Sequence, residues 1–191
     1  MEKMRCFIAV ELPLEAKSAL DCLQTELKRG QQSFVKWVRA DNIHITLKFL
    51  GSTPVEAIKD IVQSLTKVAN SSEPFHLELG GLGCFPNWNR PQVIWVGLGG
   101  EVERLANLQK EVDLAMHTLG FAQESRAFVP HLTLARIKGG SQEDIKFFGE
   151  RVSATEFAKG VPIDVDELSL MESKLTPSGP LYNQLALAQL G

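Results

Sequence analysis

The feature that most constrains this chain is an internal repeat. The segment HITLKFLG at 44–51 returns as HLTLARIKG at 131–139, an offset of 87 residues. The same offset carries the apolar run 6–10 onto the apolar run 93–97. A repeat that maps several segments at once indicates two copies of one supersecondary unit. We therefore expect a duplicated fold with a pseudo-twofold axis between the copies.

Both copies show the same order of strand, helix, histidine-bearing strand, helix and strand. Apolar residues recur with the period of an amphipathic helix after the first strand of each copy. Thr53-Pro54-Val55-Glu56 has the form of a capping box and predicts the start of a further helix. The expected helices cover 14–27, 53–68, 101–119 and, more weakly, 141–148, and alternating closing strands cover 75–79 and 163–168.

The length of 191 residues fits one substantial domain. We expect a single bilobal domain over 1–191, with approximate lobes 1–85 and 90–175. Segment 176–191 is expected to complete the sheets. The connection 80–91 is rich in Gly, Pro and Asn, which predicts a loop at the seam between the halves.

Charge and cysteine content exclude several classes of protein. Twenty Lys and Arg against 23 Asp and Glu give a net charge of −3, so the chain lacks the basic field of a protein that coats nucleic acid. Three cysteines without metal-ligand spacing predict reduced thiols and no disulfide framework. No apolar run approaches the roughly 18 residues of a membrane span, and none suits a signal peptide. We expect a cytoplasmic protein.

The two His-x-Thr strands carry the candidate chemistry. Since successive side chains of a strand point to opposite faces, His44 shares a face with Thr46, and His131 with Thr133. A pseudo-twofold axis would place these four polar groups on opposite walls of one cleft. Strict alternation also puts Lys48 on the face of His44, where it either contacts phosphate or is simply solvated.

Two histidines facing each other suit a reaction in which one proton is removed and another is delivered. Cleavage of a phosphodiester is such a reaction, and threonine hydroxyls can donate to the non-bridging oxygens where charge develops. A 2',3'-cyclic phosphate fits best, because the leaving oxygen stays attached as a ribose hydroxyl. Neither strand contains the carboxylates of a metal site, so we expect no metal and no cofactor.

The remaining histidines and the tryptophans are assigned mostly to structure. His76 lies on the polar face of an alternating strand, and His117 is near the end of a helix, where a cation is favoured. Trp95 belongs to an apolar strand pattern and is expected in the core. Trp37 and Trp88 are candidates for stacking on a base.

At these residues the chain resembles the two-histidine phosphoesterase superfamily, which is marked by paired His-x-Thr-x motifs. Within it, the chain is similar to the RNA 2',3'-cyclic phosphodiesterases formerly named 2'-5' RNA ligases. The resemblance extends nearly over the whole chain, through Arg5–Ala9, Leu47–Gly51, Arg90-Pro91 and Pro130–Arg136.

The resemblance implies an α+β fold in which two antiparallel sheets, flanked by helices, surround a central cleft. It also implies metal-independent hydrolysis of a 2',3'-cyclic phosphate to a 2'-phosphomonoester. His44 would be the general acid toward the 3' oxygen, and His131 the general base on water. Arg136 matches the family arginine expected to contact phosphate. Strict alternation puts Arg136 on the face opposite His131, unless the strand ends or bulges near Ala135.

Two other functions remain open at this point. One is 2'-5' RNA ligation, the reverse chemistry in the same site. The other is a non-catalytic nucleotide-binding module, although the presence of both histidines favours catalysis. The expected partners are RNA ends or nucleotides that bear a 2',3'-cyclic phosphate, bound by a monomer without a membrane.

Overall fold

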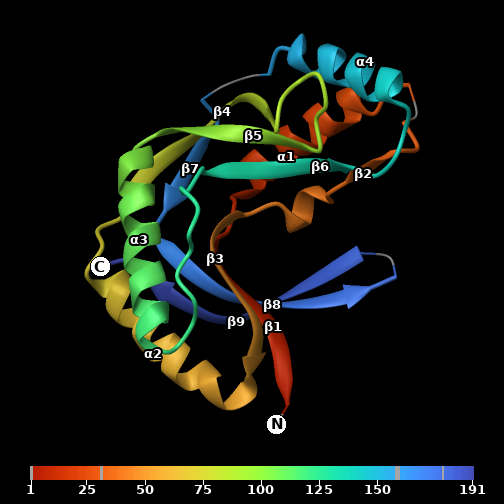
Figure 1. Ribbon diagram of the computed structural model, residues 1–191. Helices are drawn as coiled ribbons and strands as arrows, with labels where there is room; N and C mark the ends of the chain where they lie inside the picture. Colours follow the sequence, from red (N-terminus) through yellow and green to blue (C-terminus); the bar gives the residue numbers. More distant parts are fainter. Residues whose placement is uncertain (1, 31, 158–159, 178) are drawn as a thin grey trace.

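The computed structural model describes residues 2–30, 32–157, 160–177 and 179–191 (Figure 1). Within these residues it contains four α-helices and two antiparallel sheets, so the expected α+β fold is confirmed. The strands are β1 (Lys3–Val10), β2 (Val35–Trp37), β3 (Ile45–Pro54), β4 (Phe75–Phe85), β5 (Val93–Gly100), β6 (His131–Ile137), β7 (Pro162–Val165), β8 (Glu167–Thr176) and β9 (Gly179–Gln189). The helices are α1 (Leu14–Leu27), α2 (Ile58–Asn70), α3 (Val102–Thr118) and α4 (Gln142–Ser153), with short 3-10 turns η1 (Ala40–Asn42) and η2 (Val55–Ala57).

The two sheets are built on the same plan. Sheet A has the strand order β3-β1-β8-β9, and sheet B has the order β2-β6-β5-β4-β7. By the repeat, β1 corresponds to β5 and β3 corresponds to β6. It follows that β8 occupies in sheet A the place that β4 occupies in sheet B. The first half therefore contributes β4 to sheet B, and the second half contributes β8 to sheet A.

This exchange crosses the expected lobe boundaries. Lobes 1–85 and 90–175 do not coincide with the sheets, because β4 from the first half lies in sheet B and β8 from the second half lies in sheet A. Segment 176–191 supplies β9, which joins only sheet A, next to β8. Sequence similarity identifies the two repeat units, whereas each sheet is formed by hydrogen bonds between strands of both units.

One helix of each half, α1 and α3, is exchanged in the same way (Figure 1). The Gln24 side chain on α1 donates to the Leu134 carbonyl of β6 in sheet B (3.1 Å), and Arg151 on α4 donates to the Leu27 carbonyl at the end of α1 (2.6 Å). Helices α2 and α3 contact each other and sheet A. One apolar core runs through all four helices and both sheets. No described helix combines the length and apolar character needed to cross a bilayer.

The helix start expected at Thr53 is wrong. Pairing between β1 and β3 continues to Pro54, and Thr53 is buried in the strand, where its hydroxyl donates to the Gly51 carbonyl (3.2 Å). Strand pairing holds the chain extended through Pro54, the 3-10 turn η2 follows, and helix α2 begins only at Ile58. Helix α4 is longer than expected, and Ser141 caps it by accepting a hydrogen bond from the Asp144 N–H (3.1 Å).

The loop expected at 80–91 is wrong over its first half. Strand β4 continues through Gly83 to Phe85 and pairs with β5. Gly83 is a packing requirement, because a Cβ there would lie 2.2 Å from the indole ring of Trp95. One of the glycines that suggested a turn, Gly83, thus makes room for a large neighbour on the adjacent strand.

Candidate active site

A β-bulge in β3 determines which side chains accompany His44. Ala9 of β1 pairs with Thr46, but the next residue, Ile8, pairs with Lys48, so the register skips one residue of β3. The bulge turns Lys48 to the buried side of the sheet, where it is 5% exposed. The expectation that Lys48 shares the face of His44 is therefore wrong.

The buried Lys48 has partners of its own. Its Nζ contacts the Asp113 carboxylate on α3 and donates to the Ala122 carbonyl (2.5 Å). Asp113 also accepts a hydrogen bond from the Glu124 N–H (3.2 Å). These contacts fasten the loop between α3 and β6 to the back of β3. The loop leads directly to His131.

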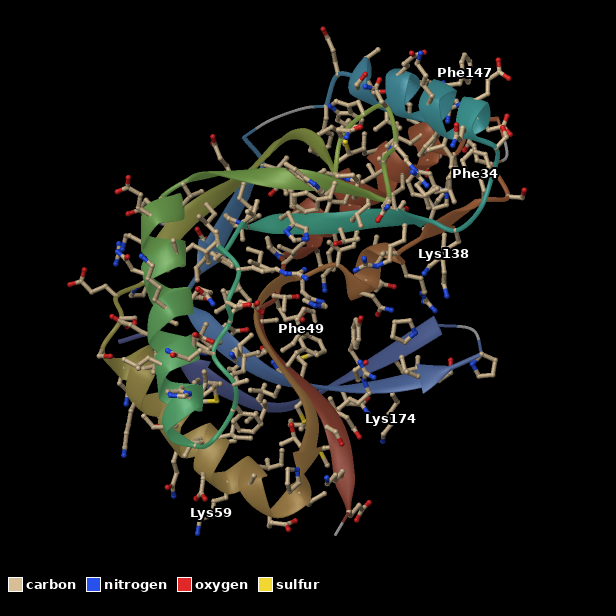
Figure 2. All side chains as sticks on the ribbon, viewed as in Figure 1. Phe34, Phe49, Lys59, Lys138, Phe147 and Lys174 are labelled. Atoms are coloured by element: carbon tan, nitrogen blue, oxygen red, sulfur yellow. The ribbon has the colours of Figure 1, made fainter. Side chains whose placement is uncertain are left out.

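Phe49 takes the place that strict alternation gave to Lys48. It pairs with Phe7 of β1, and Ala9, two residues further along β1, pairs with Thr46. Residues two apart on a strand share a face, so Phe49 lies on the face of Thr46 and His44. It is 71% exposed, and Figure 2 shows it in the region between the two sheets.

An equivalent bulge in β6 resolves the position of Arg136. Trp95 of β5 pairs with Thr133, and Ile94 pairs with Ala135, so here too the register skips one residue. Val93 then pairs with Arg136, which lies on the face that carries Thr133. The bulge that this arginine required is present, and Arg136 is exposed on the same face as His131.

Aromatic rings surround His44. Its imidazole stacks on Phe7, with ring centroids 4.6 Å apart, and meets the edge of Tyr182 at 5.3 Å. Among the described residues, no group completes a hydrogen bond to the buried Nδ1, although the Asn42 carbonyl lies close enough to favour the protonated ring. The ring is therefore fixed by packing.

Burial has the largest effect on the charge of His44. Desolvation lowers its pKa, and the Lys17 charge acts in the same direction. The Glu11 carboxylate opposes this shift but does not outweigh it. Without substrate, His44 is thus neutral at pH 7.

His131 is oriented by a main-chain hydrogen bond. Its Nδ1 lies 2.7 Å from the Val129 carbonyl, which can only accept, so Nδ1 carries the proton. In the neutral ring this leaves a lone pair on Nε2. The edge of the ring meets Phe85 at 5.1 Å, and Trp95 is 6.2 Å away.

The comparisons with known proteins agree with this duplicated site. The model of the LigT-like phosphoesterase family matches the chain twice, over residues 10–95 and 96–182. Each match contains one His-x-Thr strand. The chain belongs to the LigT-like phosphoesterase family.

Relatives and solved structures resemble this LigT-like phosphoesterase over 79–99% of its length. The RNA 2',3'-cyclic phosphodiesterase of Methanothermobacter thermautotrophicus is 32% identical, covering 98% of this chain and 100% of the relative. The RNA 2',3'-cyclic phosphodiesterase of Aeropyrum pernix is 37% identical, covering 79% of this chain and 84% of the relative. The structure of TT0787 of Thermus thermophilus has a TM-score of 0.79 and 30% identity over 98% of both chains. Escherichia coli LigT complexed with 3'-AMP has a TM-score of 0.77 and 25% identity over 99% of both chains.

Sequence reasoning misplaced Trp95 and missed Tyr182. Trp95 is partly exposed on the face of His131, whereas Trp37 and Trp88 pack against the core. Tyr182 lies on β9, outside the repeat, so no symmetry signal pointed to it. Burial raises its pKa, and the nearby charge of Arg136 lowers it, so the arginine of sheet B acts on the tyrosine of sheet A.

The other two histidines of this phosphoesterase make local contacts. Nδ1 of His76 lies 2.6 Å from the Asp164 carboxylate on the neighbouring strand. Nδ1 of His117 lies 3.2 Å from the Phe121 carbonyl, after α3. In the part of the chain that the structure describes, no three His, Cys, Asp or Glu side chains are grouped as a metal site.

Proposed function

We propose that this phosphoesterase hydrolyses the 2',3'-cyclic phosphate of RNA ends or nucleotides to a 2'-phosphomonoester, without a metal. The observation that carries the proposal is the pair of His-x-Thr strands, which have matching bulges and corresponding places in the two sheets. The relatives named RNA 2',3'-cyclic phosphodiesterase support the substrate class.

In the proposed reaction, Nε2 of His131 takes a proton from water. The water oxygen forms a bond to phosphorus while the bond from phosphorus to the 3' oxygen breaks. His44, in its protonated form, gives its proton to that oxygen, which becomes a 3' hydroxyl. The hydroxyls of Thr46 and Thr133 donate to the non-bridging oxygens as their charge grows.

The surroundings of His44 suit a general acid that becomes protonated when the substrate binds. Burial disfavours the imidazolium in the free protein, but a bound phosphodiester brings a negative charge that favours it. An imidazolium with a lowered pKa also gives up its proton more readily to the leaving oxygen. The rings of Phe7 and Tyr182 fix the imidazole while the proton is transferred.

The decisive experiment is incubation with a nucleoside 2',3'-cyclic phosphate in EDTA, followed by identification of the product isomer. We expect the 2'-phosphate at an undiminished rate. A 3'-phosphate, or activity that returns only with a divalent ion, would contradict the mechanism. Joining of two RNA ends through a 2'-5' bond would identify the ligase, and binding without turnover would identify a nucleotide-binding module.

A monomeric, cytoplasmic enzyme, as expected from the sequence, stays a prediction. Light scattering on the protein as it elutes from a size-exclusion column distinguishes a monomer from a dimer. Fractionation of the source cells tests the compartment.

A further inference from the structure

Two cations face each other directly at the edge of sheet B. Lys36 on β2 pairs in register with Arg136 on β6. Directly opposite residues of antiparallel strands project from the same face, with Cβ atoms about 4.5–5.5 Å apart. Like charges in this position are destabilising. An anion bound between the two cations would reduce this repulsion.

A third cation extends this pair. The Lys138 N–H donates to the Phe34 carbonyl (2.7 Å), so the pairing of the two segments continues past the end of β6. Lys138 follows Arg136 by two residues and therefore lies on the same face. We call Lys36, Arg136 and Lys138 the basic cluster. Figure 2 shows Lys138 at this end of the sheet, across from the β8–β9 hairpin that carries Lys174.

Within the described residues, no carboxylate forms an ion pair with the basic cluster. Several cations elsewhere do have such partners within 4 Å, including Lys17 with Glu11, Arg104 with Glu101, and Lys174 with Glu172. The whole chain carries a net charge of −3, so the cluster is a local concentration of positive charge on an acidic protein. The cluster is therefore free to take an anionic ligand as its counter-charge.

The distance along the strand indicates which anion this is. Arg136 follows His131 by five residues, one of which is taken up by the bulge. At about 3.3 Å per residue the backbone of Arg136 is roughly 13–16 Å from that of His131. The Arg136 charge nevertheless acts on Tyr182, whose ring packs on His44, so this side chain reaches back toward a phosphate held between the two histidines. Lys36 lies on the edge strand beyond β6, and Lys138 lies two residues further from His131. A free mononucleotide bound at the histidines is in reach of Arg136, and only a longer strand brings further phosphates to the two lysines.

We propose that Lys36 and Lys138, next to Arg136, bind the internucleotide phosphates that precede the terminal nucleotide. The substrate class is then an RNA strand that ends in a 2',3'-cyclic phosphate, in preference to a free cyclic nucleotide. The inference rests on the proposed function and adds to it the direction in which the strand leaves the site, along β6 toward β2. Lys36 and Lys138 are binding residues for the strand and take no part in the chemistry.

The test compares two substrates in three proteins. The substrates are a nucleoside 2',3'-cyclic phosphate and a short oligoribonucleotide with the same end. The proteins are the wild type, the double variant Lys36→Gln/Lys138→Gln, and the control Lys59→Gln, which removes one exposed charge on α2. Measured at several salt concentrations, kcat/KM separates phosphate contacts from chemistry, because each contact to a single strand adds about 0.7 to the salt slope.

We expect the double variant to lose roughly 5- to 30-fold in kcat/KM for the oligonucleotide at low salt and about 1.4 in salt slope. Turnover of the cyclic nucleotide should change less than about twofold, on the scale of a distant surface charge. Lys59→Gln should resemble the wild type with both substrates. Equal losses with both substrates, or an unchanged salt slope for the oligonucleotide, would overturn the proposal.

Failure of the proposed function gives a different result. In that case the wild type hydrolyses neither substrate, and the oligonucleotide's Kd is measured instead by fluorescence anisotropy. The double variant should then bind the labelled strand more weakly than Lys59→Gln does. Equal binding by these two variants would reject the basic cluster as a strand site.

Discussion

His44 and His131 lie at matching points of one repeated backbone, yet their surroundings differ. The rings of Phe7 and Tyr182 enclose His44, whereas the Nδ1 of His131 is bound to a main-chain carbonyl. The duplication determines where the two imidazoles lie, and their neighbours determine how each ring is held. A symmetric scaffold thus holds two imidazoles in different ways, one by stacked rings and the other by a main-chain hydrogen bond.

The difference continues where the strands leave the histidines. After equivalent bulges, β3 presents Phe49 and β6 presents Arg136, each five residues beyond its histidine. Sheet A is therefore aromatic where sheet B is cationic. A nucleotide has the same division between base and phosphate, so the asymmetry of the flanks matches the asymmetry of the ligand.

Removing one histidine at a time should have the largest effect and tests whether the two rings have different roles. His44→Ala and His131→Ala should each reduce turnover by about 100- to 10,000-fold, the usual contribution of a positioned acid or base. With a nitrophenyl leaving group, which needs no protonation, His44→Ala should regain much of its rate while His131→Ala stays slow. Steady-state rates on both substrates measure this. The opposite pattern would exchange the two roles.

A second prediction concerns stability, at a position where the repeats differ. Lys48 is buried against Asp113, whereas its counterpart in β6 is Ala135. Lys48→Met leaves a buried carboxylate without its partner and should cost about 3–5 kcal/mol of unfolding free energy, measured in urea. The double variant Lys48→Met/Asp113→Leu should recover much of this loss. A single variant as stable as the wild type would show that the pair contributes little.

The two threonines test what the repeats share, because each lies two residues after its histidine. Thr46→Val and Thr133→Val should each lower kcat by on the order of 10- to 1000-fold, the upper limit being the loss of one oxyanion donor. Circular dichroism and thermal unfolding should match the wild type. Wild-type turnover in both variants would remove these hydroxyls from the reaction.

The smallest expected effect is the pH dependence of stability that arises from His44. Its pKa is lowered in the folded protein, so below about pH 6.5 the unfolded chain binds a proton that the folded chain resists. Unfolding free energy should therefore fall as the pH drops from 7 toward the folded pKa. His44→Gln should reduce that slope in urea titrations. An identical slope in both proteins would mean that burial of His44 has no such cost.

The sequence was sufficient for the repeat and for placing His44 and His131 at corresponding points, because these follow from periodicity, and the family resemblance implied the α+β fold. It failed at Lys48 and Trp95. A bulge shifts alternation by one residue, and its only trace is a pair of consecutive buried positions. In β6 the pair is Leu134 and Ala135, both apolar, whereas in β3 the second member is a lysine, which conceals the signal.

The exchanged last strands have a consequence for how the chain is made. β1 pairs with β8, which joins residues 6–9 to residues 169–172. When the first half leaves the ribosome, one edge of β1 therefore stays unpaired until nearly the whole chain has been synthesised. Contacts so distant in sequence slow folding, and an open strand edge invites pairing with other chains. The nascent first half therefore exposes one edge of β1 until the C-terminal strand β8 pairs with it.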